Sequence, residues 1–193
     1  MRRDERLASI LDAAAGVFAG RGFGGCTMRD VAKACRISPG SLYRHVGGTA
    51  DLYYRVQRRI LEAAVASAEA TQMARTARDR LRAVVTDHIR RVIARPGEAE
   101  VIRGGPSPLP ERQRQTIEGL RVRYLALVGA AIDDVVRPKV RRKRDTERRT
   151  ELLLGMADRH AWNAAHADGP ARPDRLATPL LTLFLEGARR AGK

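Results

Sequence analysis

The chain has 193 residues, a formal net charge of +15 at neutral pH and two cysteines, Cys26 and Cys35. Its length allows one or two domains, and so few cysteines exclude a disulfide framework and a zinc motif; we expect no metal and no cofactor. The surplus positive charge favours an anionic partner, which is nucleic acid, an acidic membrane surface or an anionic ligand.

The first residues are a poor secretory signal. Arg2 and Arg3 precede an amphipathic pattern that Asp12 interrupts. No apolar run in the sequence approaches the roughly 20 residues that a membrane-spanning helix needs. We therefore expect a cytoplasmic protein with reduced thiols and no membrane partner, with a cysteine redox sensor as the open alternative.

The composition predicts an all-α fold of about nine helices, because helix-forming residues dominate and alternating β-branched runs are absent. The apolar residues of the first predicted helix, about 4–19, recur on one face: Leu7, Ile10, Leu11, Ala14 and Phe18. Gly22 ends it. Further helices are predicted at about 28–35, 39–46, 50–73, 77–94, 98–103, 110–136, 146–166 and 173–190.

Residues 27–46 contain two helix-start signals eleven residues apart. Thr27 can cap a first helix while Asp30 reaches back, a capping box with Asp in place of Glu. Ser38 can cap a second helix that has Pro39 at its first position. A short turn between two such helices predicts a helix-turn-helix. The open alternative is an ordinary antiparallel helix pair with a solvated outer face.

The second helix of this pair has a face suited to a DNA major groove, since small residues allow close approach and larger polar ones reach base edges. That face consists of Pro39, Gly40, Ser41, Tyr43, Arg44 and His45. The residues expected to pack the pair onto the first helix are Val31, Ala34, Ile37, Leu42 and Val46.

Residues 7–53 resemble the DNA-binding domain of the TetR family of bacterial transcription regulators. The landmarks at matching spacing are Phe18, Gly22, Thr27, Leu42, Tyr43 and His45. The resemblance implies a three-helix DNA-binding domain over residues 4–64, with the helix-turn-helix motif at 27–46. It implies a ligand-binding and dimerisation domain over residues 65–193.

The resemblance also assigns roles within the motif. The residues that it places at phosphates, or bracing phosphate contacts, are Thr27, Arg29, Tyr43 and His45. Those that it turns toward the bases are Pro39, Gly40, Ser41 and Arg44. Arg36 departs from the family pattern, which usually has a glycine in this turn; we expect Arg36 to strain the turn or to add a phosphate contact.

Segments 109–132, 151–162 and 179–190 resemble the sensory domain of TetR regulators, particularly a subgroup that responds to acyl-coenzyme A thioesters. The implied homodimer interface contains Leu152, Leu153, Met156, Leu180, Leu181 and Phe184. The candidate residues for an inducer pocket are Tyr53, Val56, Ile60, His88, Ile117, Leu120, Tyr124 and Trp162. For each pocket residue the alternative is an ordinary position in the core.

The sequence as a whole favours a homodimeric repressor that binds double-stranded palindromic operator DNA and that a small hydrophobic or acyl-coenzyme A ligand releases. The alternative is a ligand-independent or architectural DNA-binding protein, which the high charge suggests. We do not expect an enzyme, because the sequence has no phosphate-binding glycine loop or nucleophile elbow. The basic segment Arg137 to Arg149 could receive a ligand's phosphates or DNA, or form a solvated face.

Overall fold

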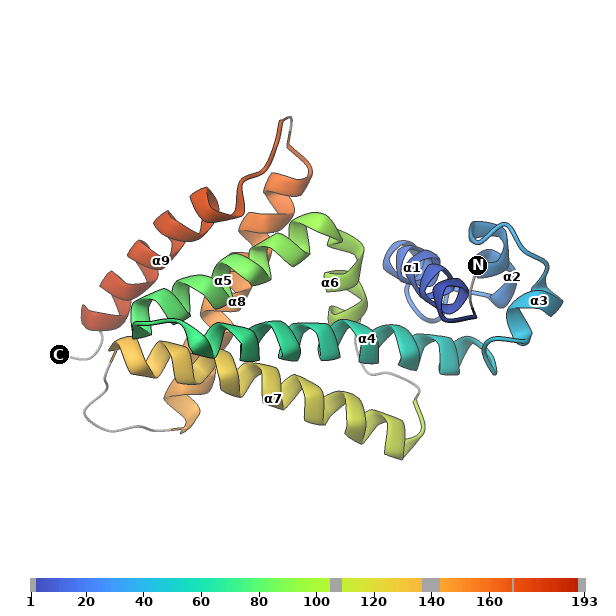
Figure 1. Ribbon diagram of the computed structural model, residues 1–193, viewed down its shortest axis with the longest axis horizontal. Helices are drawn as coiled ribbons and strands as arrows, with labels where there is room; N and C mark the ends of the chain where they lie inside the picture. The colour runs from blue at the N-terminus through green and yellow to red at the C-terminus, as the bar shows by residue number, and fades with distance from the viewer. Residues whose placement is uncertain (1–2, 105–108, 137–142, 168, 191–193) are drawn as a thin grey trace. The chain divides into compact units, whose positions relative to one another are not determined.

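The computed structural model describes residues 3–104, 109–136, 143–167 and 169–190, and every regular element in these ranges is helical (Figure 1). The helices are α1 (Arg3–Arg21), α2 (Met28–Ala34), α3 (Pro39–Tyr43), α4 (Thr49–Ala70), α5 (Ala77–Ala94), α6 (Pro96–Arg103), α7 (Glu111–Val136), α8 (Lys143–Ala165) and α9 (Pro173–Arg190). A 3-10 turn at Thr71–Met73 follows α4. The expectation of an all-α fold is confirmed.

Two details of the first helices differ from the sequence analysis. Helix α3 ends at Tyr43, because the amides of Arg44 and His45 bond to carbonyls three residues back, as in a tightened final turn. Ala34 is exposed and Ala32 is buried instead. The buried stripe of α2 runs through Met28, Val31 and Ala32, at spacings of three and four, and Ala34 lies off it.

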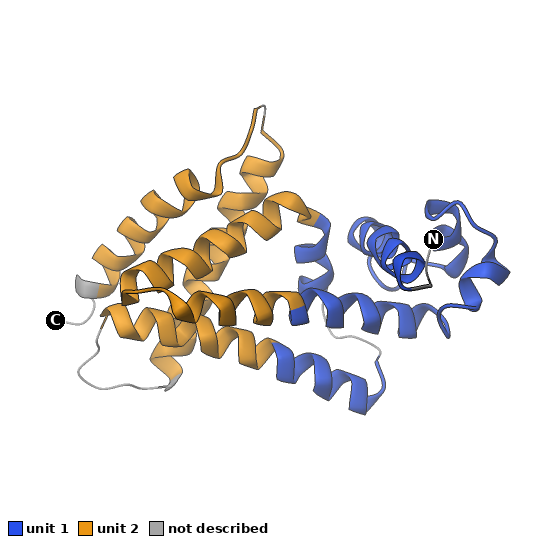
Figure 2. Cartoon of the chain, viewed as in Figure 1, with its two compact units in different colours: residues 1–62, 97–120 blue, residues 63–96, 121–193 orange. Residues whose placement is uncertain are grey.

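The chain forms two compact units, each built from two stretches of sequence (Figure 2). Unit 1 comprises residues 1–62 and 97–120, and unit 2 comprises residues 63–96 and 121–193. Residues 97–120 thus group in space with the N-terminal helices, although the sequence analysis assigned them to a second domain. Because spatial compactness and independent function are different properties, the expected functional boundary between residues 64 and 65 stays a prediction.

Unit 1 is built around an aromatic cluster. The ring of Tyr53 in α4 meets Phe18 edge-on with centroids 4.9 Å apart, and Phe23 with centroids 5.1 Å apart. The Tyr53 hydroxyl donates a hydrogen bond to the carbonyl oxygen of Val101 in α6, 3.1 Å away. Tyr53 therefore supplies apolar contact area and a polar anchor at once, and burial raises the pKa of its phenol.

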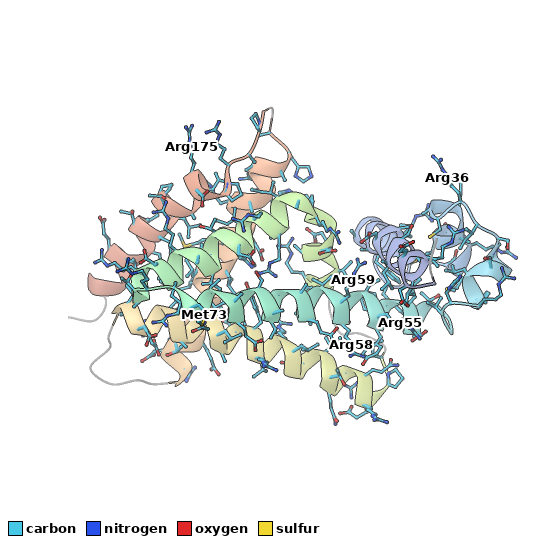
Figure 3. The ribbon with its side chains drawn as sticks, in the orientation of Figure 1. Arg36, Arg55, Arg58, Arg59, Met73 and Arg175 are labelled. Carbon is cyan, nitrogen blue, oxygen red and sulfur yellow. The ribbon has the colours of Figure 1, made fainter. Side chains whose placement is uncertain are left out.

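Arg59 fastens three helices of unit 1 to one another (Figure 3). Its guanidinium Nη2 lies 2.8 Å from a carboxylate oxygen of Asp12 in α1 and 3.5 Å from one of Glu98 in α6. Its Nη1 donates to the carbonyl oxygen of Ala8 at 3.3 Å. The planar, many-donor guanidinium suits such a junction. Helix α6 is therefore held to α1 and α4 although it lies far from both in sequence.

Unit 2 has α5 at its centre. This helix packs against both α8 and α9, and it buries Leu81, Val84, Val85 and Ile89 almost completely. Helices α7 and α8 approach closely at Gly129, where a Cβ atom would lie only 2.8 Å from Cγ2 of Thr146. A side chain at position 129 would push these two helices apart. Of the basic segment Arg137 to Arg149, residues 137–142 lie outside the described residues.

Candidate nucleic-acid interface

The start of α2 is fixed by the capping box that the sequence predicts. The Thr27 hydroxyl oxygen accepts a hydrogen bond from the Asp30 amide at 3.2 Å, and the Asp30 carboxylate accepts one from the Thr27 amide at 2.9 Å. The Thr27 hydroxyl also donates to this carboxylate at 2.6 Å. Both caps satisfy amides that the helix itself leaves unpaired.

Arg21 at the end of α1 supports this cap, and the sequence analysis missed it. Its guanidinium Nη1 donates to the Asp30 carboxylate at 2.6 Å. The pKa of Asp30 is lowered, first by the hydrogen bonds from the Thr27 side chain and backbone, and further by the charge of Arg21. Arg21 therefore balances a negative charge that would otherwise repel a phosphate beside Thr27.

The turn between α2 and α3 passes through Arg36. This residue has a φ of 53°, in the left-handed region that favours glycine. The Arg36 amide bonds to the Lys33 carbonyl at 3.1 Å, and the Ile37 amide bonds to the Ala32 carbonyl at 3.0 Å. The expectation that Arg36 strains this turn is thus confirmed.

Helix α3 is short and is held at one point. Ser38 caps it by accepting a hydrogen bond from the Ser41 amide at 3.1 Å, and Pro39 occupies the first helical position, as expected. Its one buried residue is Leu42, which is fully enclosed in the core of unit 1. The next residue, Tyr43, is 56% exposed. One side of α3 is therefore an anchor and the other is open to a partner.

The junction from α3 to α4 is fixed by Asp51, a second residue that the sequence analysis did not single out. Its carboxylate accepts the Gly47 amide at 2.8 Å and the Nε of Arg55 at 2.9 Å. The four-residue spacing of Asp51 and Arg55 is a signal that could have revealed this pair. No comparable signal links Arg21 to Asp30, which are nine residues apart.

All nine predicted DNA contacts lie between residues 27 and 45, and none of them is buried. The exposed ones are Thr27, Arg29, Arg36, Pro39, Gly40, Tyr43 and Arg44. The half-buried ones are Ser41 and His45. The Arg44 guanidinium donates to the Ser41 hydroxyl at 3.0 Å, which orients it along the exposed side of α3. The structure therefore brings the whole predicted set together on accessible surface.

Two family models match this chain. Residues 10–56 match the model of the bacterial regulatory proteins of the tetR family. Residues 74–188 match that of the tetracyclin repressor-like C-terminal domain. The chain belongs to the TetR family. It is therefore a transcription regulator with a helix-turn-helix DNA-binding domain.

Solved structures of TetR-family regulators share this fold over nearly their whole length. The regulator PfmR from Thermus thermophilus is 25% identical, with a TM-score of 0.76 over 92% of this chain and 97% of that one. FadR from Bacillus subtilis, solved with stearoyl-CoA, is 18% identical, with a TM-score of 0.69 and coverages of 93% and 98%. AibR, solved with isovaleryl coenzyme A and operator DNA, is 22% identical, with a TM-score of 0.75 and coverages of 92% and 97%. A comparison with curated protein sequences gave no match.

The ligand-pocket candidates of this TetR-family chain are divided between the two units. Those in unit 1 are Tyr53, Val56, Ile60, Ile117 and Leu120. Tyr53 and Val56 are buried in the core of unit 1, and Ile60 and Ile117 pack against it. The assignment of these four residues to a ligand pocket stays a prediction. Those in unit 2 are His88, Tyr124 and Trp162.

His88 and Tyr124 belong to a chain of polar groups inside unit 2. Arg91, which also binds Asp87 at 2.9 Å, donates from Nη2 to the Tyr124 hydroxyl oxygen at 3.2 Å. That oxygen has its own hydrogen to donate to His88 Nδ1 at 2.9 Å, and His88 Nε2 then donates to Asp158 at 2.9 Å. Burial raises the pKa of the Tyr124 phenol, and Arg91 opposes that shift.

Trp162, the third candidate in unit 2, pairs with the histidine that follows the end of its helix. Its ring centroid lies 4.2 Å from that of His166, and the His166 Nδ1 hydrogen-bonds to the Trp162 carbonyl oxygen at 2.8 Å. The two side chains are one helical turn apart, at the end of α8. The structure thus gives Trp162 a local partner just beyond α8.

The interface candidates also fall into two groups. Leu153, Leu181 and Phe184 are buried within unit 2, and their place in a homodimer interface stays a prediction. Leu152, Met156 and Leu180 instead line an open hollow of about 930 Å³ between α8 and α9. Leu183, which the sequence analysis left out of this set, also lines it and is 65% exposed.

None of the helices in the described ranges is both long enough and apolar enough to cross a lipid bilayer. The cysteines Cys26 and Cys35 are free thiols, and burial raises the pKa of each. A raised pKa lowers the fraction of reactive thiolate at neutral pH. The geometry therefore gives the redox alternative no support.

The Asp30 cap should make the DNA reader sensitive to acid. Because the folded pKa of Asp30 lies below its unfolded value of about 3.9, its ionised form stabilises the fold above that pH, and this stabilisation is lost as the pH falls further. We expect Asp30→Asn to lower the melting temperature near neutral pH and to converge with the wild type in acid. Melting curves across the pH range measure this, and a constant difference down to the lowest pH would contradict it.

Proposed function

We propose that this TetR-family chain is a cytoplasmic homodimeric repressor that binds palindromic operator DNA through α3 and that a small ligand releases. The observation that carries the proposal is the geometry of α3. Its single buried residue, Leu42, fixes the helix while Gly40, Tyr43 and Arg44 stay exposed. A helix held from behind and open in front is what major-groove reading requires.

The exposed residues divide by chemistry into two tasks. Arg44 can read a guanine edge with two parallel hydrogen bonds, and the absence of a side chain at Gly40 lets the backbone come close. Arg29 is exposed at the start of α2, where its positive charge favours a phosphate, and Thr27 braces this contact through its cap. The Tyr43 hydroxyl is suited to a second phosphate. Phosphate contacts set the position of the reader, and base contacts set its sequence preference.

The hollow between α8 and α9 supports a dimer. Leu152 and Leu183 are 63% and 65% exposed within it, which is unusual for large aliphatic residues on a monomer surface. Arg148, Glu151 and Arg159 border the same hollow. In a two-fold arrangement each partner presents the same patch, so the glutamate of one copy can meet an arginine of the other. A second copy is therefore the occupant that fits this surface.

Dimerisation explains how a ligand could control DNA binding. Two copies of α3 can occupy successive major grooves only if they are held about one DNA turn, roughly 35 Å, apart. A ligand that favours a different separation removes one half-site contact. Helix α4 runs without a break from unit 1 into unit 2, so a change in unit 2 has a continuous helical route to the reader.

The proposed ligand is an acyl-coenzyme A thioester or a related anionic amphiphile. FadR and AibR, which share this fold, were solved with stearoyl-CoA and isovaleryl coenzyme A. In unit 2 the candidate contacts are His88, Tyr124 and Trp162, and Arg91 donates a hydrogen bond to the Tyr124 hydroxyl. Arginine and tyrosine donors suit a carbonyl or phosphate oxygen.

A second candidate function is a ligand-independent or architectural DNA-binding protein, which the net charge of +15 favours. Such a protein would bind all duplexes through phosphate contacts, with a strong salt dependence and little sequence preference. Footprinting on long DNA separates the two, because a repressor protects one palindrome and an architectural protein protects every segment alike.

Arg44 and Tyr43 should affect DNA binding in different ways. We expect Arg44→Ala to weaken binding of a duplex selected from a random pool by about 1 to 3 kcal/mol and to relax preference at one base pair. Tyr43→Phe should weaken all duplexes similarly, because phosphate contacts carry no sequence information. Selection followed by sequencing measures both effects. Arg78→Ala, which removes an exposed arginine of α5, is the control, and an intact preference in Arg44→Ala would place the recognition surface elsewhere.

The dimer should depend on Leu183. We expect Leu183→Asp to give a monomer that stays helical and loses operator binding, because a charge would be buried against the second copy. Val122→Asp is the matched control, since Val122 is 56% exposed on α7 and lies outside the hollow. Leu181 is buried, so a charge there would test folding instead. Analytical ultracentrifugation gives the masses, and an undiminished dimer from Leu183→Asp would remove this interface.

The ligand proposal predicts selective release of DNA. We expect an acyl-coenzyme A to release the selected duplex saturably, whereas free coenzyme A and a cationic dye should not. Salt must be fixed, because any polyanion can compete with DNA for a basic surface. Fluorescence anisotropy of labelled DNA follows the release. Release by the dye alone, or equal release by free coenzyme A, would count against an acyl-thioester ligand.

A further inference from the structure

Arg36 stands apart in the backbone of this chain. Among the residues that the structure describes, it is the one non-glycine residue with a positive φ. The other positive angles belong to Gly22, Gly48 and Gly169. In the left-handed region the Cβ of an L-residue crowds the neighbouring carbonyl oxygen, so a non-glycine residue there destabilises the fold unless something compensates.

The hydrogen bonds of the turn between α2 and α3 do not require an arginine at position 36. The bond from the Ile37 amide to the Ala32 carbonyl and the bond from the Arg36 amide to the Lys33 carbonyl form a Schellman motif that ends α2. Both bonds use backbone atoms alone. Arg36 occupies the position of this motif where glycine is favoured, and glycine would make the same bonds without crowding. The side chain must therefore be explained outside the turn.

The Arg36 side chain does not contribute to the core of unit 1. It is exposed, and Figure 3 shows it projecting away from the helices of unit 1. Its guanidinium has no carboxylate partner within the described ranges of the chain. By contrast, Arg21, Arg55 and Arg59 of the same unit each hold a carboxylate. Arg36 is thus a cation that the fold keeps free at a strained position.

A structural explanation competes with a functional one. A cation beyond the end of α2 interacts favourably with the negative end of the helix dipole. Lys33 already lies in that last turn, and α2 is only seven residues long. The dipole explanation involves no DNA, so it predicts no change in DNA binding when the charge of Arg36 is removed.

We propose that Arg36 binds a DNA phosphate and that the strained turn is kept for this contact. Arg36 lies two residues before Ser38, the cap at the leading end of α3. When α3 enters a major groove, the segment before it meets the phosphates that border the groove. A guanidinium can bind a phosphate with two parallel hydrogen bonds. This inference rests on the proposed DNA-binding function.

Three substitutions separate charge from backbone strain. Arg36→Gly removes the strain and the charge, Arg36→Asn removes the charge but tolerates the left-handed conformation, and Arg36→Lys keeps both. Arg175→Gln is the matched control, because Arg175 is an exposed arginine of unit 2 and its loss changes the net charge equally. Binding of a labelled random-sequence duplex is measured over a salt series, together with the melting temperature of each protein.

We expect the slope of log binding constant against log salt to become shallower by about one in Arg36→Gly and Arg36→Asn. Arg36→Lys and Arg175→Gln should keep the wild-type slope. Arg36→Gly should also melt about 2–4 °C above the wild type, as relief of strain in a chain of this size predicts. The glycine variant is therefore expected to be more stable and to bind DNA less well.

An unchanged slope in Arg36→Gly and Arg36→Asn would overturn the proposal and leave the dipole explanation. An equal loss of slope in Arg175→Gln would also overturn it, because the effect would then follow net charge alone. A wild-type protein that binds neither the random duplex nor a selected one would instead refute the proposed function itself. The wild-type titration thus distinguishes the two failures.

Discussion

A five-residue helix such as α3 is not stable by itself in water. The DNA-binding domain of this chain therefore depends on the contacts that stabilise α3. Helix α3 exists because Leu42 is enclosed in the core of unit 1 and because both of its neighbouring turns are fixed by hydrogen bonds. The Ser38 cap sets where it starts, and the Asp51 carboxylate holds the chain beyond its end through Gly47. Because the buried side and both ends stabilise α3, the residues on its exposed side are not needed for the fold.

The core that encloses Leu42 is not a property of the N-terminal helices alone. Val101 belongs to the same buried cluster, and its carbonyl oxygen accepts hydrogen bonds from both Tyr53 and Gln57. Arg59 adds an ionic connection from α4 to α6. The stability of the DNA-binding helices is therefore coupled to α6, which only Arg95 separates from α5 of unit 2. Helix α6, which contains none of the predicted DNA contacts, thus helps to hold the DNA-binding helices in place.

Local chemistry made the helices and the caps predictable from sequence, because Thr27, Asp30, Ser38 and Pro39 act on neighbours within a few residues. The expectation of strain at Arg36 came from the family resemblance, because this turn position is usually glycine in the family. Contacts between distant segments could not be predicted from the sequence. No local pattern around Arg59 indicates its ion pairs with Asp12 and Glu98, and none around Arg21 indicates its ion pair with Asp30. The same limit applies to Leu153 and Leu181, which the structure places in the buried part of unit 2. An apolar stripe predicts that one side of a helix is buried. When the helix packs against two neighbours, only the structure shows which neighbour each leucine contacts.

The contact between Trp162 and His166 has a practical consequence. Trp162 is the only tryptophan of the chain, and it lies in unit 2 with its ring against His166. Indole emission responds to the polarity and the charge around the ring. The protein therefore carries one intrinsic optical probe, placed in the half that is proposed to sense a ligand and absent from the half that reads DNA. A change in that emission reports on the surroundings of the ring in unit 2. Ligand sensing can therefore be followed in unlabelled protein, while a label on the duplex reports release.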